Sequence, residues 1–94
     1  MKAVEVARMV VREGTMLGLD NRAPMRPSQC VIKVHPATMY ALRSDNDSWV
    51  LVKTGHVDQQ LFGIKIVVDD DVPENLLRLV DAATGEIVVS GRYS

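Results

Sequence analysis

The feature that most constrains this chain is the period-two alternation of apolar residues in LFGIKIVVDD, residues 61–70. Successive side chains of a strand point to opposite faces, so apolar residues at every second position give the strand one apolar face. The pattern predicts a strand, and Gly63 within it indicates a β-bulge or a close approach of another backbone. The predicted apolar face consists of Phe62, Ile64, Ile66 and Val68.

Two shorter stretches rich in β-branched residues also predict strands. The first is CVIKV, residues 30–34, in which alternate apolar residues share one face. The second is WVLV, residues 49–52, and the polar stretch KTGHVDQQ that follows it predicts a connector.

A short helix is predicted between these two strands. Pro36 sets its first turn, and the pattern ends at Arg43. Met39 and Leu42 would face inward. His35, just before the proline, is expected to end the strand or to cap the helix.

Residues 1–14, MKAVEVARMVVREG, predict an amphipathic helix, with Gly14 following its last turn. A helix of about a dozen residues is marginal alone, so its apolar side must dock. We favour docking on the chain's own core, with a neighbouring subunit as the alternative. The polar side carries Lys2, Glu5, Arg8 and Arg12, and the apolar side carries Ala3, Val4, Val6, Ala7, Val10 and Val11.

Residues 72–83 are compatible with two structures. One is a helix capped by Asp71, with Pro73 in its first turn and Gly85 beyond its end. The other is a pair of strands, LLRLV and EIVVS, joined by the turn DAATG. We favour the hairpin.

These elements predict a single domain over residues 1–94, because a chain of this length suffices for one core. It divides into a helix at 1–14, a linker at 15–29 that has two prolines and no periodicity, and a core at 30–94. The expected fold class is α+β, with an N-terminal helix, a small mixed or antiparallel sheet and one short helix after Pro36.

The composition points to an intracellular, reducing setting. Hydrophobic residues make up 47% of the chain, and the single cysteine cannot form an internal disulfide. No apolar signal-peptide region follows the first two residues, and no run approaches a membrane-spanning length. We therefore expect no secretion and no membrane partner.

The net charge of −1 conceals an asymmetry along the chain. Residues 1–43 hold seven basic and three acidic side chains, for a net charge of +4, whereas residues 44–94 hold four basic and nine acidic ones, for −5. Such a distribution suits contact with a charged partner or with further copies of the chain. The asymmetry disappears if the fold interleaves the two halves.

Three consecutive aspartates, Asp69, Asp70 and Asp71, are the densest cluster of possible metal ligands. Consecutive carboxylates on a strand point to opposite faces, and calcium loops space their ligands at alternate positions and add a bidentate glutamate. The cluster therefore predicts a solvated strand end, and we expect neither a metal nor another cofactor.

The chain shows no catalytic constellation. Cys30 would have to meet His35 or His56 in space to form a nucleophile–base pair, and its apolar surroundings are typical of a buried thiol. Arg22 and Arg26 lack the aromatic neighbours and the basic run of a nucleic-acid site. We expect no enzymatic activity and no nucleic-acid partner.

From about Gln29 to Ala82 the order of elements resembles the peripheral-domain segment of HK97-like major capsid proteins of tailed bacteriophages. In that family a strand leads into a short helix, a second strand follows, and a strand of the form hydrophobic-Gly-hydrophobic-x-Val closes on a proline turn. A capsid protein is several times longer, and only residues 1–14 stand where its long spine helix would be. The resemblance implies a separately encoded, capsid-related small protein of a phage or prophage. The matching positions are His35, Pro36, Leu42, Leu61, Gly63, Ile64, Val67 and Pro73.

We therefore expect a non-catalytic protein that acts through protein–protein contacts. Its partners would be copies of itself or other virion proteins, and it would be found in the cytoplasm of the infected bacterium or in the virion. The alternative is a phage-encoded inhibitor that binds a host enzyme or defence factor. The expected contact residues are Lys2, Arg8, Arg12, Asp69, Asp70 and Asp71.

Overall fold

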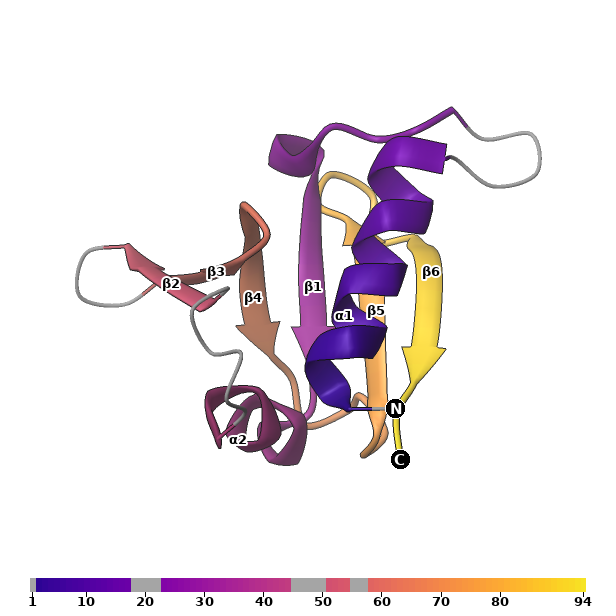
Figure 1. Ribbon diagram of the computed structural model, residues 1–94. Helices are drawn as coiled ribbons and strands as arrows, with labels where there is room; N and C mark the ends of the chain where they lie inside the picture. The colour runs from indigo at the N-terminus through magenta and orange to yellow at the C-terminus, as the bar shows by residue number, and fades with distance from the viewer. Residues whose placement is uncertain (1, 18–22, 45–50, 55–57) are drawn as a thin grey trace.

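A computed structural model describes residues 2–17, 23–44, 51–54 and 58–94 (Figure 1). In these residues, helices pack against one mixed β-sheet. The elements in chain order are α1 (Ala3–Arg12), the π-helical turn η1 (Glu13–Leu17), the 3₁₀ turn η2 (Pro27–Gln29), β1 (Cys30–Val34), α2 (Pro36–Ser44), β2 (Leu51–Thr54), β3 (Asp58–Leu61), β4 (Ile64–Val68), β5 (Leu76–Asp81) and β6 (Ile87–Arg92).

The sheet has six strands in the order β2-β3-β4-β1-β5-β6. β1 runs parallel to β4 and antiparallel to β5, and the remaining pairs are antiparallel. Ile32 in β1 is level with Ile66 in β4 and with Leu79 in β5, so the apolar positions of three adjacent strands line up. The expected α+β fold, with an N-terminal helix, a mixed sheet and a short helix after Pro36, is confirmed.

α1 covers the apolar face of the sheet. It packs against β5 and β6 and contacts α2, and Figure 1 shows it lying along the strands in front of the sheet. Its predicted apolar side is confirmed, and so is docking on the chain's own core. The residues that it buries are Ala3, Val4, Val6, Ala7, Val10 and Val11.

Two glycines let the helical segment approach the sheet closely. A Cβ at Gly91 would lie 2.6 Å from Cγ1 of Val6 and 2.7 Å from Cγ2 of Val10. A Cβ at Gly14 would clash with Cδ2 of Leu79. Gly14 follows the last turn of α1 as predicted, because α1 ends at Arg12 with Glu13 as its C-cap, but the chain continues into η1, where this glycine is buried. Gly14 is needed for close packing against Leu79, and it does not form a left-handed helix end.

Residues 61–70 do not form one strand. β3 ends at Leu61, β4 begins at Ile64, and these two residues pair across a two-residue turn. Phe62 has φ 54° and Gly63 has φ 79°, the positive pair that two-residue hairpin turns use. The predicted bulge or close approach at Gly63 is wrong: no described atom lies within 4 Å of a Cβ built there, and only the positive φ favours glycine.

The hairpin that we favoured for residues 72–83 and beyond is confirmed as β5 and β6. The carboxylate of Asp81 accepts a hydrogen bond from the N–H of Ala83 at 2.8 Å, and Gly85 has φ 78°. An aspartate that bonds its own turn and a glycine at positive φ are the features that favour a turn over a helix here.

The predicted strand at 49–52 is confirmed for residues 51 and 52, whereas the predicted polar connector differs from the structure. β2 begins at Leu51 and extends to Thr54, and β3 follows, so most of the predicted connector is a hairpin. The ladder of backbone hydrogen bonds does not require apolar side chains, which is why a polar stretch forms these strands. Trp49 and His56 lie outside the described residues.

β1 passes into α2 at His35. Its Nδ1 accepts a hydrogen bond from the N–H of Ala37 at 3.0 Å, and its carbonyl accepts one from the N–H of Thr38 at 2.9 Å. These bonds satisfy N–H groups that the first turn of a helix leaves unpaired. The expected capping role is confirmed, and Met39 and Leu42 are buried as predicted.

The two oppositely charged halves of the sequence interleave in the fold. β1, from the basic half, lies between β4 and β5 of the acidic half, and α1 packs on β5 and β6. The asymmetry along the chain therefore does not produce two opposite poles.

Candidate functional site

The basic side of α1 is exposed, as expected for a contact surface. Lys2, Arg8 and Arg12 are all exposed, and Met9 beside them is 40% exposed. The guanidinium carbon of Arg8 lies 5.5 Å from the centre of the Phe62 ring, a cation–π distance. Arg8 thus also holds the β3–β4 turn, whereas the contact role of these residues stays a prediction.

The three aspartates form the turn that follows β4. The N–H of Asp69 donates to the carbonyl of Val34 at 2.8 Å, and its carboxylate accepts from the N–H of Asp71 at 2.9 Å. Oδ2 of Asp69 lies 3.8 Å from Nζ of Lys33. Asp69 therefore has a structural role, and of the three aspartates only Asp70 and Asp71 are exposed. Among the described residues, no ion pair joins this turn to the basic side of α1.

Cys30 is not placed to act as a nucleophile. Its side chain is 3% exposed, and its Sγ donates to the carbonyl of Arg26 at 3.4 Å. Burial, and secondarily the charge of Asp81, raise the pKa of the thiol, which disfavours the reactive thiolate. His35 follows the other end of β1, about 16 Å along the strand. The two residues therefore cannot form a pair.

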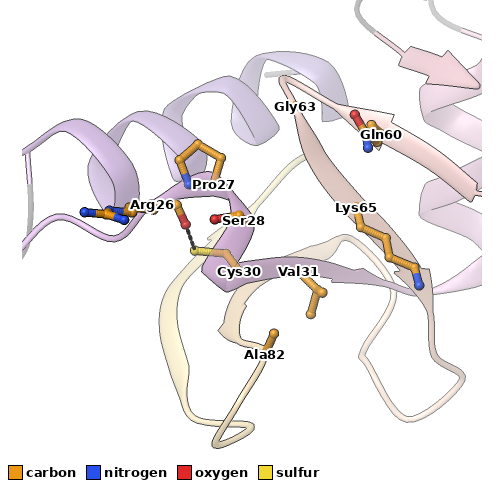
Figure 2. A pocket seen from close by; sticks show the side chains of 9 residues that line it. All are labelled: Arg26, Pro27, Ser28, Cys30, Val31, Gln60, Gly63, Lys65 and Ala82. Carbon is orange, nitrogen blue, oxygen red and sulfur yellow. Dashed lines mark hydrogen bonds between the residues drawn. The ribbon is translucent and has the colours of Figure 1, made fainter. Parts of the chain in front are cut away.

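A hollow of about 830 Å³ lies where η2 meets the sheet (Figure 2). The side chains of Arg26 and Lys65 point in different directions there, so its polar groups do not converge on one point. Small-molecule sites have a few polar groups that converge, and this hollow lacks that property. Its lining residues are Arg26, Pro27, Ser28, Cys30, Val31, Gln60, Gly63, Lys65 and Ala82.

A further surface is the sheet face opposite α1, which no described helix covers (Figure 1). We call it the open face. The strand register arranges its side chains in rows that run across the sheet. The first row is Lys65, Val31, Val80 and Ile87, and the second is Val67, Lys33, Arg78 and Ser90. Leu76 and Arg92 form a third, shorter row.

Two cations lie side by side at the centre of the open face. The register places Lys33 directly opposite Arg78. Like charges in directly opposite positions destabilise a sheet. Nε of Arg78 is moreover buried and has no hydrogen-bond partner among the described residues. The pair at 3.8 Å between Lys33 and Asp69 is exposed in part, and such pairs contribute little.

Sequence reasoning missed the open face. Its cations occupy the polar positions of three strands that are far apart in the chain, where each one alone indicates only a solvated residue. No local pattern could have shown that Lys33 and Arg78 are neighbours, because the pairing of β1 with β5 decides it.

No protein-family model, curated protein or solved structure matches this chain. Within the residues that the structure describes, no group of three possible metal ligands occurs, and no helix is long and apolar enough to cross a membrane. The resemblance to capsid peripheral domains therefore stays a prediction, and the surfaces described above are the remaining indication of function.

Proposed function

We propose that this chain is a small phage or prophage protein that acts without catalysis, through protein–protein contacts within or on the virion. The proposal combines the resemblance to capsid peripheral domains with one structural observation, the open face. Before assembly such a protein would reside in the cytoplasm of the infected bacterium.

The open face supports a role in binding for a physical reason. Strands in parallel pairs are usually covered on both faces, yet β1 and β4 are parallel and covered by a described helix on one face only. The open face mixes aliphatic and cationic side chains, and Ile87 on it is 48% exposed. Interfaces join an apolar core to a polar rim and are enriched in arginine, so Arg78 beside aliphatic side chains supports this role.

Catalysis finds less support in the described residues. The thiol of Cys30 is buried with a raised pKa, and Nδ1 of His35 is occupied by the N–H of Ala37. The hollow at η2 has no convergent polar groups. These features favour a binding protein over an enzyme.

Co-sedimentation with phage particles tests the proposal. The chain would be tagged at its C-terminus in a lysogen, and particles released by induction would be banded on a density gradient. We expect the tagged chain in the particle band, with a tagged unrelated small protein as the control. Recovery only in the free fraction, in a stoichiometric complex with one host enzyme, would replace this proposal with the inhibitor alternative.

A further inference from the structure

We propose that the open face docks an acidic, amphipathic α-helix of a partner protein, whose carboxylates pair with Lys33 and Arg78. This inference rests on the proposed function and adds to it the surface and the chemistry of the partner. It assigns the contact to residues other than those on α1 and in the aspartate turn.

The charges on the open face favour an acidic partner. Lys33, Lys65, Arg78 and Arg92 give this face four basic side chains, and one of them, Lys33, has its Nζ 3.8 Å from Oδ2 of Asp69. The central pair, Lys33 and Arg78, destabilises the isolated sheet, since two like charges face each other. A carboxylate placed between them would reverse that repulsion and bind the guanidinium in a charge-assisted hydrogen bond.

The apolar residues favour an amphipathic partner over a purely charged one. Val31 and Val67 are half-buried on the open face, Val80 between Val31 and Ile87 is only 2% exposed, and Ile87 at the edge is 48% exposed. They alternate with the cations, so a partner that contacts the cations also covers aliphatic surface. A segment with an apolar stripe flanked by carboxylates satisfies both.

The dimensions fit one helix. Neighbouring strands lie about 4.8 Å apart, so the four strands β4, β1, β5 and β6 span about 14 Å from first to last. An α-helix with its side chains is about 10–12 Å wide. On the opposite face, the single helix α1 lies along the strands and packs against β5 and β6.

Two other occupants fit less well. Proteins that bind single-stranded nucleic acid on a sheet stack the bases on aromatic side chains, and none of the described residues on the open face is aromatic. A second copy docked face to face would bring the Lys33–Arg78 pair of one copy against cations of the other. Both occupants remain outcomes of the test.

A peptide titration followed by NMR tests the inference. The probe is a synthetic 18-residue helix with leucine on one face and glutamate on its flanks, and the matched peptide has lysine in place of every glutamate. We expect the glutamate peptide to shift the backbone amides of β1, β4, β5 and β6, and the lysine peptide to shift none. Arg78→Gln and Lys33→Gln should each weaken binding about tenfold, the effect of losing one close charge pair.

The controls separate binding from folding. Arg12→Gln, which removes an exposed arginine of α1 on the other side of the sheet, should leave the affinity unchanged. Arg78→Gln should not lower the melting temperature, because it removes a like-charge contact. Equal binding of both peptides, no binding, shifts confined to α1, or tighter binding of a 20-nucleotide single strand would overturn the inference. Amide shifts on the open face with protein concentration alone would assign it to a second copy instead.

The gradient experiment distinguishes failure of this inference from failure of the proposed function. If the double variant Lys33→Gln/Arg78→Gln enters particles as well as the wild type, the proposed function stands and the docking surface is wrong. If the wild type stays out of particles while the glutamate peptide binds the open face, the docking surface stands and the virion role is wrong.

Discussion

The face of the sheet under α1 and the open face are made by the same central strands, residue by alternate residue. Under α1, Ile32 and Leu79 are fully buried. Gly91 lacks a side chain at the point where Val6 and Val10 of the helix pack against β6. One residue away along each strand, the open face presents cations and aliphatic residues that are half-buried, apart from the buried Val80 and the exposed Ile87. The difference shows that packing dictates the first set of residues and does not dictate the second.

Volume explains the covered face. Interiors are packed as densely as organic crystals, so each side chain there must fit its neighbours to within a fraction of a methyl group. The open face has no such constraint, yet it holds Lys33 and Arg78 in opposite positions at a cost in stability. The docking of an acidic helix that we propose would account for that choice.

The largest expected effect contrasts leucines on the two faces of β5. Leu79→Ala removes a fully buried side chain under α1 and should lower the free energy of unfolding by about 2–5 kcal/mol. Leu76→Ala, on the open face and half-buried, should cost about 1 kcal/mol. Urea unfolding measures both values. Equal losses would contradict the distinction between the faces.

Gly91→Ala should cause the next largest loss in the free energy of unfolding. The added Cβ would lie 2.6 Å from Val6 Cγ1 and 2.7 Å from Val10 Cγ2, so α1 must shift, at about 1–3 kcal/mol. Ser90→Ala, the neighbouring exposed position on the open face, should change the free energy of unfolding by less than about 0.5 kcal/mol. If Gly91→Ala is as mild as this control, α1 does not approach β6 as closely as described.

Gly63→Ala tests a glycine that belongs to neither face. Nothing described surrounds this position, so the expected loss of about 1 kcal/mol comes from the φ of 79° alone. Gly63→Asn should lose less, because asparagine tolerates positive φ better than alanine. Thermal unfolding measures the stability of the two variants. A larger loss of stability in Gly63→Asn than in Gly63→Ala would argue against the turn.

The smallest effect concerns the thiol on the covered face. Burial raises the pKa of Cys30 above its ordinary value of 9.0, so the folded state holds this proton more tightly than the unfolded state. The associated stability is fully present below about pH 9 and is lost as pH rises through the folded pKa. The free energy of unfolding should therefore fall more steeply above pH 9 in the wild type than in Cys30→Ala. Parallel curves would show that the thiol is not held in a protected environment.

The sequence by itself determined most of the local elements. The apolar side of α1, the buried positions of β1, the cap at His35 and the β5–β6 hairpin all follow from residues within a few positions of one another. The sequence did not reveal the β3–β4 turn, because Phe62 occupies its first central position, where asparagine or aspartate is the usual signal. Arg8 above the Phe62 ring helps to hold that conformation, and it is remote in sequence.

Only the tertiary structure decided the rest. Sheet order and register depend on pairing between segments far apart in the chain, so no local period reveals that β1 lies between β4 and β5. That pairing interleaves the oppositely charged halves, places Lys33 opposite Arg78, and brings Gly91 under α1. Periodicity fixes which face of its own element a residue occupies, whereas the residue's neighbours on that face are set by long-range pairing.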